Sequence, residues 1–192
     1  MSKKLNELTK QEWDTLFPIE LVDHNPEWKL IFEEEKQQIN QKIGNRIIGI
    51  EHVGSTSIPN IKSKSYIDIS IIISEIDLFN EEIIQALQRL DYHFFRQNGK
   101  GQDYMVFVKG YNLNGEKEQV FHIHMHPPGH EMASQVIFRN YLIANPDRAR
   151  EYEQLKCELA VKYKNDRVGY RLAKNDFIVE TMQMVKEEKF CS

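Results

Sequence analysis

A turn rich in small and hydroxyl-bearing residues is the first segment whose composition can do chemistry. It reads His-Val-Gly-Ser-Thr-Ser from His52 to Ser57. Small residues let the backbone approach a ligand closely, and free N–H groups together with hydroxyls can hold phosphate oxygens. A hydroxyl-capped turn between a strand and a helix would have the same composition. The segment therefore predicts either a structural turn or a phosphate-binding one, whose ligand groups would be Gly54, Ser55, Thr56 and Ser57.

An aspartate inside an apolar strand pattern is the second candidate. The run Ile67-Asp68-Ile69-Ser70-Ile71 alternates, which places Asp68 and Ser70 on the same face. A buried carboxylate is costly unless a cation or several donors satisfy it. Asp68 is therefore either a Mg²⁺ ligand beside a phosphate or a carboxylate that hydrogen-bonds a neighbouring loop. Lys64, four residues earlier, either faces the same phosphate or lies on the surface.

Three histidines alternate in the segment Phe-His-Ile-His-Met-His from Phe121 to His126. On a strand their side chains share one face. The pair His122 and His124 can offer two imidazoles to one metal ion, can lie beside a phosphate, or can face solvent as a polar strand surface. His126 and His130 flank Pro-Pro-Gly, so we expect both to lie in a loop. We expect Asp68, the Gly-Ser turn and the paired imidazoles to converge on one cavity at the rim of a sheet.

The elements that must position these residues follow from periodicity and from turn residues. The patterns predict strands over 19–22, 47–53, 66–73, 92–96, 103–109 and 118–125. They predict helices over 9–16, 26–43, 78–90, 131–144, 146–163 and 168–188, and a hairpin turn over 112–115. The expected fold class is α/β (α+β), with a mixed sheet of five or so strands flanked by helices and closed by a C-terminal helical layer. We expect a single domain over 1–192, with a helical extension over 1–18, the sheet core over 19–130 and the helical layer over 131–192.

Composition narrows the classes of partner. The 192 residues carry 25 basic and 29 acidic side chains, a formal charge of −4. A general nucleic-acid binder would usually be basic, whereas a local basic pocket for one phosphorylated ligand is compatible with this balance. No apolar run approaches the roughly 20 residues of a membrane span, and the first residues do not resemble a signal peptide. Two cysteines, Cys157 and Cys191, are too few for a disulfide scaffold, so we expect a cytoplasmic protein without membrane contact. The oligomeric state leaves no trace in the sequence.

Taken together, these segments resemble the GrpB-like family, from about residue 19 to the C-terminus. The resemblance is carried by the segments 50–59, 64–69, 122–124 and 138–142, together with Asn145-Pro146, Tyr152 and Leu155-Lys156. The family is similar to the nucleotidyltransferase superfamily, which pairs a Gly-Ser turn with an acid-x-acid strand that holds Mg²⁺. In some proteins a GrpB-like module is fused to a dephospho-CoA kinase. The resemblance therefore implies a nucleotidyltransferase-like fold, and a nucleotide or a coenzyme-A-related metabolite as the small-molecule partner.

Matched residue by residue, Gly54 and Ser55 correspond to the Gly-Ser motif and Asp68 to the first acid. Ser70 stands at the second acid position, and a hydroxyl brings no charge for holding two metal ions. His122 and His124 occupy the strand where a third acid would be sought. The family often has Lys-Pro where this chain has Lys64-Ser65.

Three functional hypotheses follow. In the first, a metal-dependent nucleotidyltransferase transfers a nucleotide to a small acceptor. Asp68 would then hold Mg²⁺, Gly54 and Ser55 the triphosphate, and His122 or His124 would complete the metal shell or act as a base. In the second, the same pocket binds a nucleotide or phosphorylated metabolite without chemistry, which Ser70 favours. In the third, a transition metal binds at His52, His122 and His124.

The C-terminal helical layer allows two interpretations of its cationic and aromatic residues. They can pack against the sheet with their charged ends in solvent. Alternatively, three of them can close the pocket and neutralise or stack on the ligand, namely Arg139, Tyr141 and Lys174.

Overall fold

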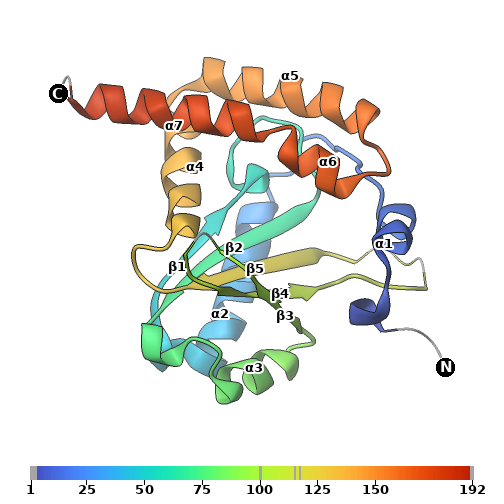
Figure 1. Cartoon of the computed structure of the whole chain (residues 1–192), viewed down its shortest axis with the longest axis vertical. Helices are drawn as coiled ribbons and strands as arrows, with labels where there is room; N and C mark the ends of the chain where they lie inside the picture. Colours follow the sequence, from blue (N-terminus) through green and yellow to red (C-terminus); the bar gives the residue numbers. More distant parts are fainter. Residues whose placement is uncertain (1–3, 100, 115, 117, 191–192) are drawn as a thin grey trace.

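A five-stranded mixed sheet forms the centre of the computed structural model, which describes residues 4–99, 101–114, 116 and 118–190 (Figure 1). The strands are β1 (Ile47–Val53), β2 (Tyr66–Ile73), β3 (His93–Gln97), β4 (Tyr104–Lys109) and β5 (Val120–His126), in the spatial order β1-β2-β5-β4-β3. Only the central pair β2–β5 is parallel; the other neighbouring pairs are antiparallel. The mixed sheet predicted from the sequence is therefore confirmed, with each of these strands within two residues of its predicted bounds.

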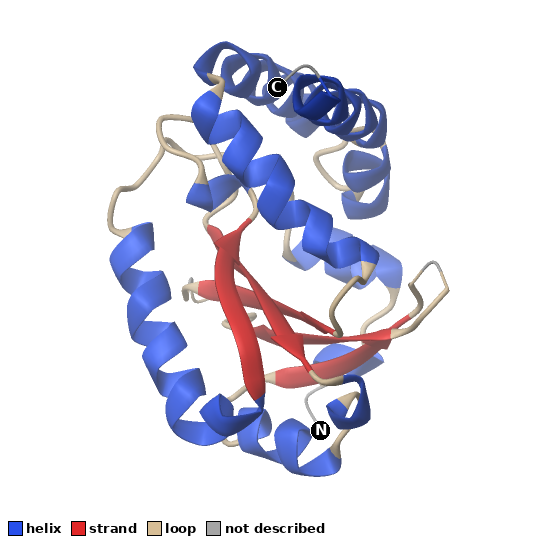
Figure 2. Cartoon of the chain, turned by 90° about the vertical axis from the view of Figure 1, so that its left-hand side faces the viewer, coloured by secondary structure: helices blue, strands red, loops and turns tan. Residues whose placement is uncertain are grey.

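Alternation along β2 decides what each face of the sheet does. Ile67, Ile69, Ile71 and Ile73 are fully buried on one face. They pack in a single apolar cluster with α2 (Trp28–Ile43) and α3 (Glu81–Gln88). Because successive strand residues point to opposite faces, Asp68 is directed to the other side of the sheet. Figure 2 shows helices on both sides of the strands.

The C-terminal helices cover the face to which Asp68 points. They are α4 (Ser134–Ala144), α5 (Pro146–Lys162), α6 (Arg167–Leu172) and α7 (Asn175–Phe190). In Figure 1, α5 and α7 run side by side, and Arg148 of α5 donates to Thr181 of α7. The helix predicted over 168–188 is thus two helices, because the chain turns at Ala173–Lys174 before α7 packs along α5.

The N-terminal segment contains a short 3-10 helix, η1 (Leu5–Glu7), and α1 (Lys10–Leu16). The predicted capping box at Thr9 and Glu12 is present. The predicted strand over 19–22 is wrong, since it makes only an isolated bridge between Val22 and Ser63. The predicted helix over 78–90 is shorter, because the Asn80 side chain caps α3.

Four further 3-10 turns join these elements: η2 (Gly44–Arg46), η3 (Ser55–Ser57), η4 (Glu75–Asp77) and η5 (Glu131–Ala133). β4 and β5 pair as the antiparallel partners expected of a hairpin, although Gly115 of the predicted turn lies outside the described residues, as does Cys191. Within the described part of the chain, no helix is both long and apolar enough to cross a membrane.

Candidate functional site

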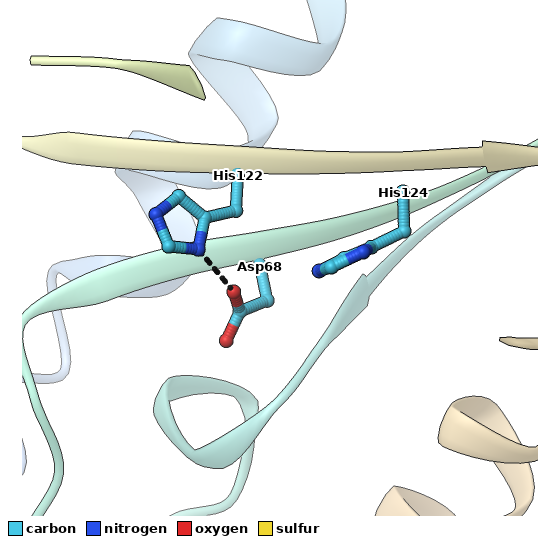
Figure 3. Close-up of side chains that lie close together, drawn as sticks. All are labelled: Asp68, His122 and His124. Atoms are coloured by element: carbon cyan, nitrogen blue, oxygen red, sulfur yellow. Dashed lines mark ion pairs between the residues drawn. The ribbon is translucent and has the colours of Figure 1, made fainter. Parts of the chain in front are cut away.

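Asp68, His122 and His124 meet on one face of the central strand pair (Figure 3). In the parallel register of β2 and β5, Asp68 lies opposite His122, and His124 is two residues further along β5. One donor atom from each side chain lies within 4.8 Å of the other two. Asp68 Oδ1 is 3.3 Å from His122 Nδ1, and the ring of His124 points toward Asp68. Their convergence follows from strand pairing and side-chain alternation alone.

A chain of polar contacts holds the ring of His122. Its Nε2 lies 2.7 Å from the Tyr111 hydroxyl, which accepts a hydrogen bond from Arg167 Nη2 at 2.8 Å. Because a guanidinium can only donate, the Tyr111 hydroxyl proton is free to face His122 Nε2. That arrangement leaves the proton of a neutral His122 on Nδ1, where it points at the Asp68 carboxylate. The imidazole is thereby fixed at both nitrogens.

Burial and the neighbouring groups set the charge states of the cluster. Burial alone would raise the pKa of Asp68, but the contact with His122 and the surrounding positive groups lower this pKa to about 2. Burial lowers the pKa of His122 and brings that of His124 to about 4. At neutral pH the cluster therefore consists of one carboxylate and two neutral imidazoles, the protonation states in which these side chains bind metal ions.

His124 has an unusual feature: its Nδ1 is buried and has no hydrogen-bond partner among the described residues. Buried polar atoms nearly always have a partner, and an exception calls for a specific cause.

A cavity of about 470 Å³ opens above the cluster. Of the described residues that line it, Asp68 alone is acidic, while five are cationic: Lys64, Lys156, Arg167, Arg171 and Lys174. The protein as a whole carries a formal charge of −4. The cavity is therefore a cationic site within an acidic protein, and it suits an anionic ligand.

Two of these lysines, Lys64 and Lys156, have lowered pKa values and therefore hold their protons less tightly than a lysine in solvent. Lys64 Nζ lies 4.6 Å from the centre of the Tyr66 ring, and burial, assisted by Arg167, lowers the pKa of Lys64 to about 7. Burial also lowers the pKa of Lys156 to about 7, and its ammonium donates to the carbonyl of Lys62.

The turn after β1 closes over Asp68. Gly54 has φ of 71°, and a Cβ at this position would lie only 2.3 Å from Asp68 Oδ2. Glycine is therefore required both by the backbone conformation and by the close approach of the carboxylate. Ser55 and Thr56 line the cavity beside it.

Two of the predicted site residues, His52 and Ser57, do not line the cavity above Asp68. His52 pairs with Ile69 across the strands, which directs its ring to the α2 face. There it stacks on Phe32 and its Nε2 contacts the Thr56 hydroxyl at 3.0 Å. Ser57 bonds the carbonyl of Gly54 and lines a second cavity together with His52. The structure therefore does not bring His52 to the cluster of Asp68, His122 and His124.

Ser70 shares the face of Asp68 but is committed elsewhere. Its hydroxyl lies 3.0 Å from His126 Nε2, and both side chains are buried. His126 is thus the last residue of β5 rather than a loop residue, which corrects the expectation from the sequence.

Arg139 and Tyr141 of α4 are also separated from the cluster. Arg139 donates to Glu51 and to the carbonyl of His52, and it lines the second cavity. The Tyr141 hydroxyl donates to Glu188 of α7. Of the three C-terminal residues expected at the pocket, only Lys174 lines the cavity above Asp68.

The sequence gives no signal for two important groups. Tyr111 lies after β4, and Arg167 begins α6, more than fifty residues later. No local spacing links either residue to His122. A tyrosine or arginine that acts through another side chain can be found only once the elements are packed.

The family model described as GrpB protein matches residues 18–184. The glutamate-rich protein GrpB of Alkalihalophilus pseudofirmus is 34% identical over 166 residues, which are 84% of this chain and 92% of that protein. YqkA of Bacillus subtilis is 32% identical over 175 residues, covering 89% of this chain and 48% of that protein, so the chain spans about half of its length.

A crystal structure of the conserved protein GrpB from Enterococcus faecalis superimposes with a TM-score of 0.74 at 28% identity, covering 89% of this chain and 99% of that one. A more distant match is a dephospho-CoA kinase of Mycolicibacterium paratuberculosis, 24% identical over 72% of this chain and 39% of that enzyme.

Proposed function

The chain belongs to the GrpB family, and from this premise we propose that it binds a nucleotide or another phosphorylated small molecule in the cavity above Asp68. The observation that carries the proposal is the gathering of five basic side chains around a single carboxylate in a protein of net negative charge. Phosphate groups are the common small-molecule anions whose charge matches such a site. The distant match to a dephospho-CoA kinase favours nucleotides and coenzyme-A-related metabolites among them.

The cavity residues would divide the work of binding. Arg171 and Lys174 supply charge from the helical layer, and Arg167 supplies it from beside His122. The turn at Gly54 and Ser55 presents backbone and hydroxyl groups to the same space. Lys64 would gain its full charge on contact with a phosphate.

The reaction class that we propose is nucleotidyl transfer to a small acceptor. A divalent metal ion bound by Asp68, His122 and His124 would supply positive charge to the phosphate oxygens. The residues do not fit the pair of Mg²⁺ ions that the superfamily implies, because the hydroxyl at the second acid position, Ser70, is tied to His126. Asp68, with its lowered pKa, is suited to holding a cation rather than to accepting a proton at neutral pH.

A second candidate function, binding without turnover, is favoured by the same observation at Ser70. A single carboxylate balances less of the positive charge of bound metal ions than the two or three carboxylates of a two-metal site do.

Binding can be tested by calorimetric titration with nucleoside triphosphates, dephospho-coenzyme A and phosphopantetheine, with and without divalent ions. We expect Arg171→Gln and Lys174→Gln each to weaken binding by about 10–150-fold, since a hydrogen bond to a charged group contributes about 1.5–3 kcal/mol. Arg150→Gln is the matched control, because Arg150 is exposed and pairs with Asp147 on the surface. Failure of every phosphorylated compound to bind, or equal affinities in the three variants, contradicts the proposal.

Turnover separates the two candidate functions. Release of pyrophosphate from a bound triphosphate, abolished in Asp68→Asn while the nucleotide still binds, supports transfer. Tight binding with no product under any metal condition selects the binding module instead.

A further inference from the structure

We propose that Asp68, His122 and His124 bind a single transition-metal ion, with Zn²⁺ and Co²⁺ as representative members, in place of the Mg²⁺ that the resemblance implies. This proposal extends the proposed function. The role of the ion, which is to help bind the phosphorylated ligand, rests on that function. The arrangement of the three donor side chains does not.

The chemistry of the donor set carries the choice of metal. One carboxylate oxygen and two imidazole nitrogens lie within 4.8 Å of one another on adjacent strands. Mg²⁺ takes oxygen ligands in near-octahedral geometry, whereas imidazole suits Zn²⁺, Co²⁺, Ni²⁺ and Fe²⁺. A further oxygen ligand would favour Mg²⁺, but the nearby hydroxyl of Ser70 contacts His126 instead. Two nitrogens and one oxygen thus favour a transition metal.

His122 is oriented as metal-binding histidines commonly are. Its Nδ1 faces Asp68, while its Nε2 faces Tyr111, which Arg167 holds in place. When Nδ1 binds a metal ion, the ring proton must reside on Nε2. The Tyr111 hydroxyl can then accept from Nε2 instead of donating to it, because a hydroxyl can do both. Tyr111 is therefore a positioning residue that fixes the ring with its Nδ1 toward the cluster.

His124 supplies an independent observation. Its Nδ1 is buried without a partner among the described residues, although its ring points toward Asp68. No hydrogen bond within the described chain explains why an imidazole is kept in this place. A metal ion bound through the ring nitrogen that faces Asp68 would give this imidazole a partner.

The cluster is closed by protein on one side and open on the other. Strands β2 and β5 supply all three donors, and the cavity of about 470 Å³ lies on the side of the cluster that faces away from the sheet. Three protein ligands with remaining positions open to a cavity are typical of catalytic rather than structural zinc sites. The cationic side chains around the cavity repel a lone metal ion, so an anionic ligand at the open positions would strengthen its binding.

The test is a titration of the full chain, freed of metal by chelation, with Zn²⁺, Co²⁺ and Mg²⁺ separately. We expect one Zn²⁺ or Co²⁺ per chain, visible absorption bands from bound Co²⁺, and no displacement of either ion by excess Mg²⁺. His124→Ala and Asp68→Asn should each lose the stoichiometric binding and the Co²⁺ bands. His93→Ala is the matched control, since His93 is an exposed imidazole on β3, and it should bind as the wild type does.

Tyr111→Phe tests the positioning role, because it keeps the ring and removes the hydroxyl. We expect an affinity for Zn²⁺ lower by about 10–100-fold and a shift of the Co²⁺ bands, which loss of packing alone would not produce. Absence of stoichiometric Zn²⁺ and Co²⁺ binding by the wild type, or displacement by Mg²⁺, overturns the inference whether or not the variants fold. Nucleotide binding without a transition-metal site would refute this inference alone, and a metal site without nucleotide binding would refute the proposed function alone.

Discussion

Lys64 is a basic side chain whose pKa is set by burial at the proposed anion site. It is half-buried, its ammonium lies over the Tyr66 ring, and burial lowers its pKa to about 7 with help from Arg167 and Lys174. In the protein without ligand, a substantial fraction of this lysine is therefore neutral at physiological pH. A phosphate in the cavity would favour the charged form, so we expect ligand binding to be coupled to proton uptake.

This coupling predicts a pH dependence of binding. The affinity for a phosphorylated ligand should fall as pH rises through about 7, and the fall should be shallower in Lys64→Met. The phosphate and Lys156 titrate similarly in both proteins. The difference between the two profiles of affinity against pH therefore reports the titration of Lys64 alone. Lys162→Met, which removes an exposed lysine over Tyr163, should follow the wild type. Parallel profiles for wild type and Lys64→Met would contradict the prediction.

The sign for stability follows from the same shift. A lysine with a lowered pKa in the folded state binds its proton more weakly than in the unfolded chain, where the pKa is 10.5. The free energy of unfolding therefore rises with pH between about 7 and 10.5, and the penalty of the buried charge is fully present below this window.

Among the elements, the turn from β1 into η3 has the most direct effect on the site. It ends one strand, places Ser55 and Thr56 at the cavity, and brings its backbone against the Asp68 carboxylate. The backbone of Gly54 occupies a region of φ and ψ that is almost restricted to glycine.

Gly54→Ala should therefore damage both the fold and the cluster. The strained backbone costs about 1–3 kcal/mol of unfolding free energy, and the added Cβ pushes Asp68 out of place. Urea unfolding and Zn²⁺ titration of the same samples measure the two effects. The control is Gly49→Ala on β1, where the atom nearest to an added Cβ is Ile72 Cδ1 at 3.6 Å, an ordinary van der Waals distance. If Gly54→Ala binds Zn²⁺ as tightly as the wild type does, the close approach of the turn to the Asp68 carboxylate is not needed for metal binding.

Helix α6 brings its charges to the site through helical spacing. Arg167 and Arg171 are four residues apart, so they share one face of the helix and both line the cavity. The N-terminal segment steadies this helix: Asp14 accepts from the backbone N–H of Arg167, and the carbonyl of Phe17 accepts from its guanidinium. Both contacts come from residues that precede the family match at residue 18. The segment before the match therefore supports the position of Arg167 beside Tyr111.

At the scale of the molecule, the net charge and the local charge have opposite signs. The formal charge of −4 is an average over the surface, whereas the cavity gathers cations from β2, α5, α6 and α7 or their connections. Such a site would attract an anion locally although the protein as a whole is acidic.

This arrangement predicts reciprocal coupling between metal and anion. A nucleoside triphosphate should raise the affinity for Zn²⁺, and Zn²⁺ should raise the affinity for the triphosphate by the same factor, about 5–150-fold, as linkage requires. Calorimetry in both orders of addition measures the two factors. Adenosine, which has no phosphate, serves as the control and should show no coupling. Antagonism between metal and triphosphate, or equal coupling with adenosine, would contradict the arrangement.

The sequence by itself determined the five strands of the sheet and the faces of β2, since alternation is a local property, although it also predicted a strand over 19–22 that does not form. The apolar positions 67, 69, 71 and 73 and the polar positions 68 and 70 could be assigned to opposite faces before any packing was known. That Asp68 and the two histidines would meet was an expectation that alternation alone could not establish, because it depends on β2 pairing with β5. Helix boundaries were less accurate, because a cap at Asn80 and a turn at Lys174 interrupt otherwise periodic patterns.

Only the tertiary structure decided which of the candidates meet. Strand pairing directed His52 to the α2 face and His124 to the cavity, and packing of the C-terminal helices brought Lys174 to the site while Arg139 and Tyr141 found partners elsewhere. Tyr111 and Arg167 reach His122 through contacts between segments far apart in the chain. The physical reason is that periodicity encodes the direction of a side chain relative to its own element, whereas the neighbour it meets depends on how separate elements pack.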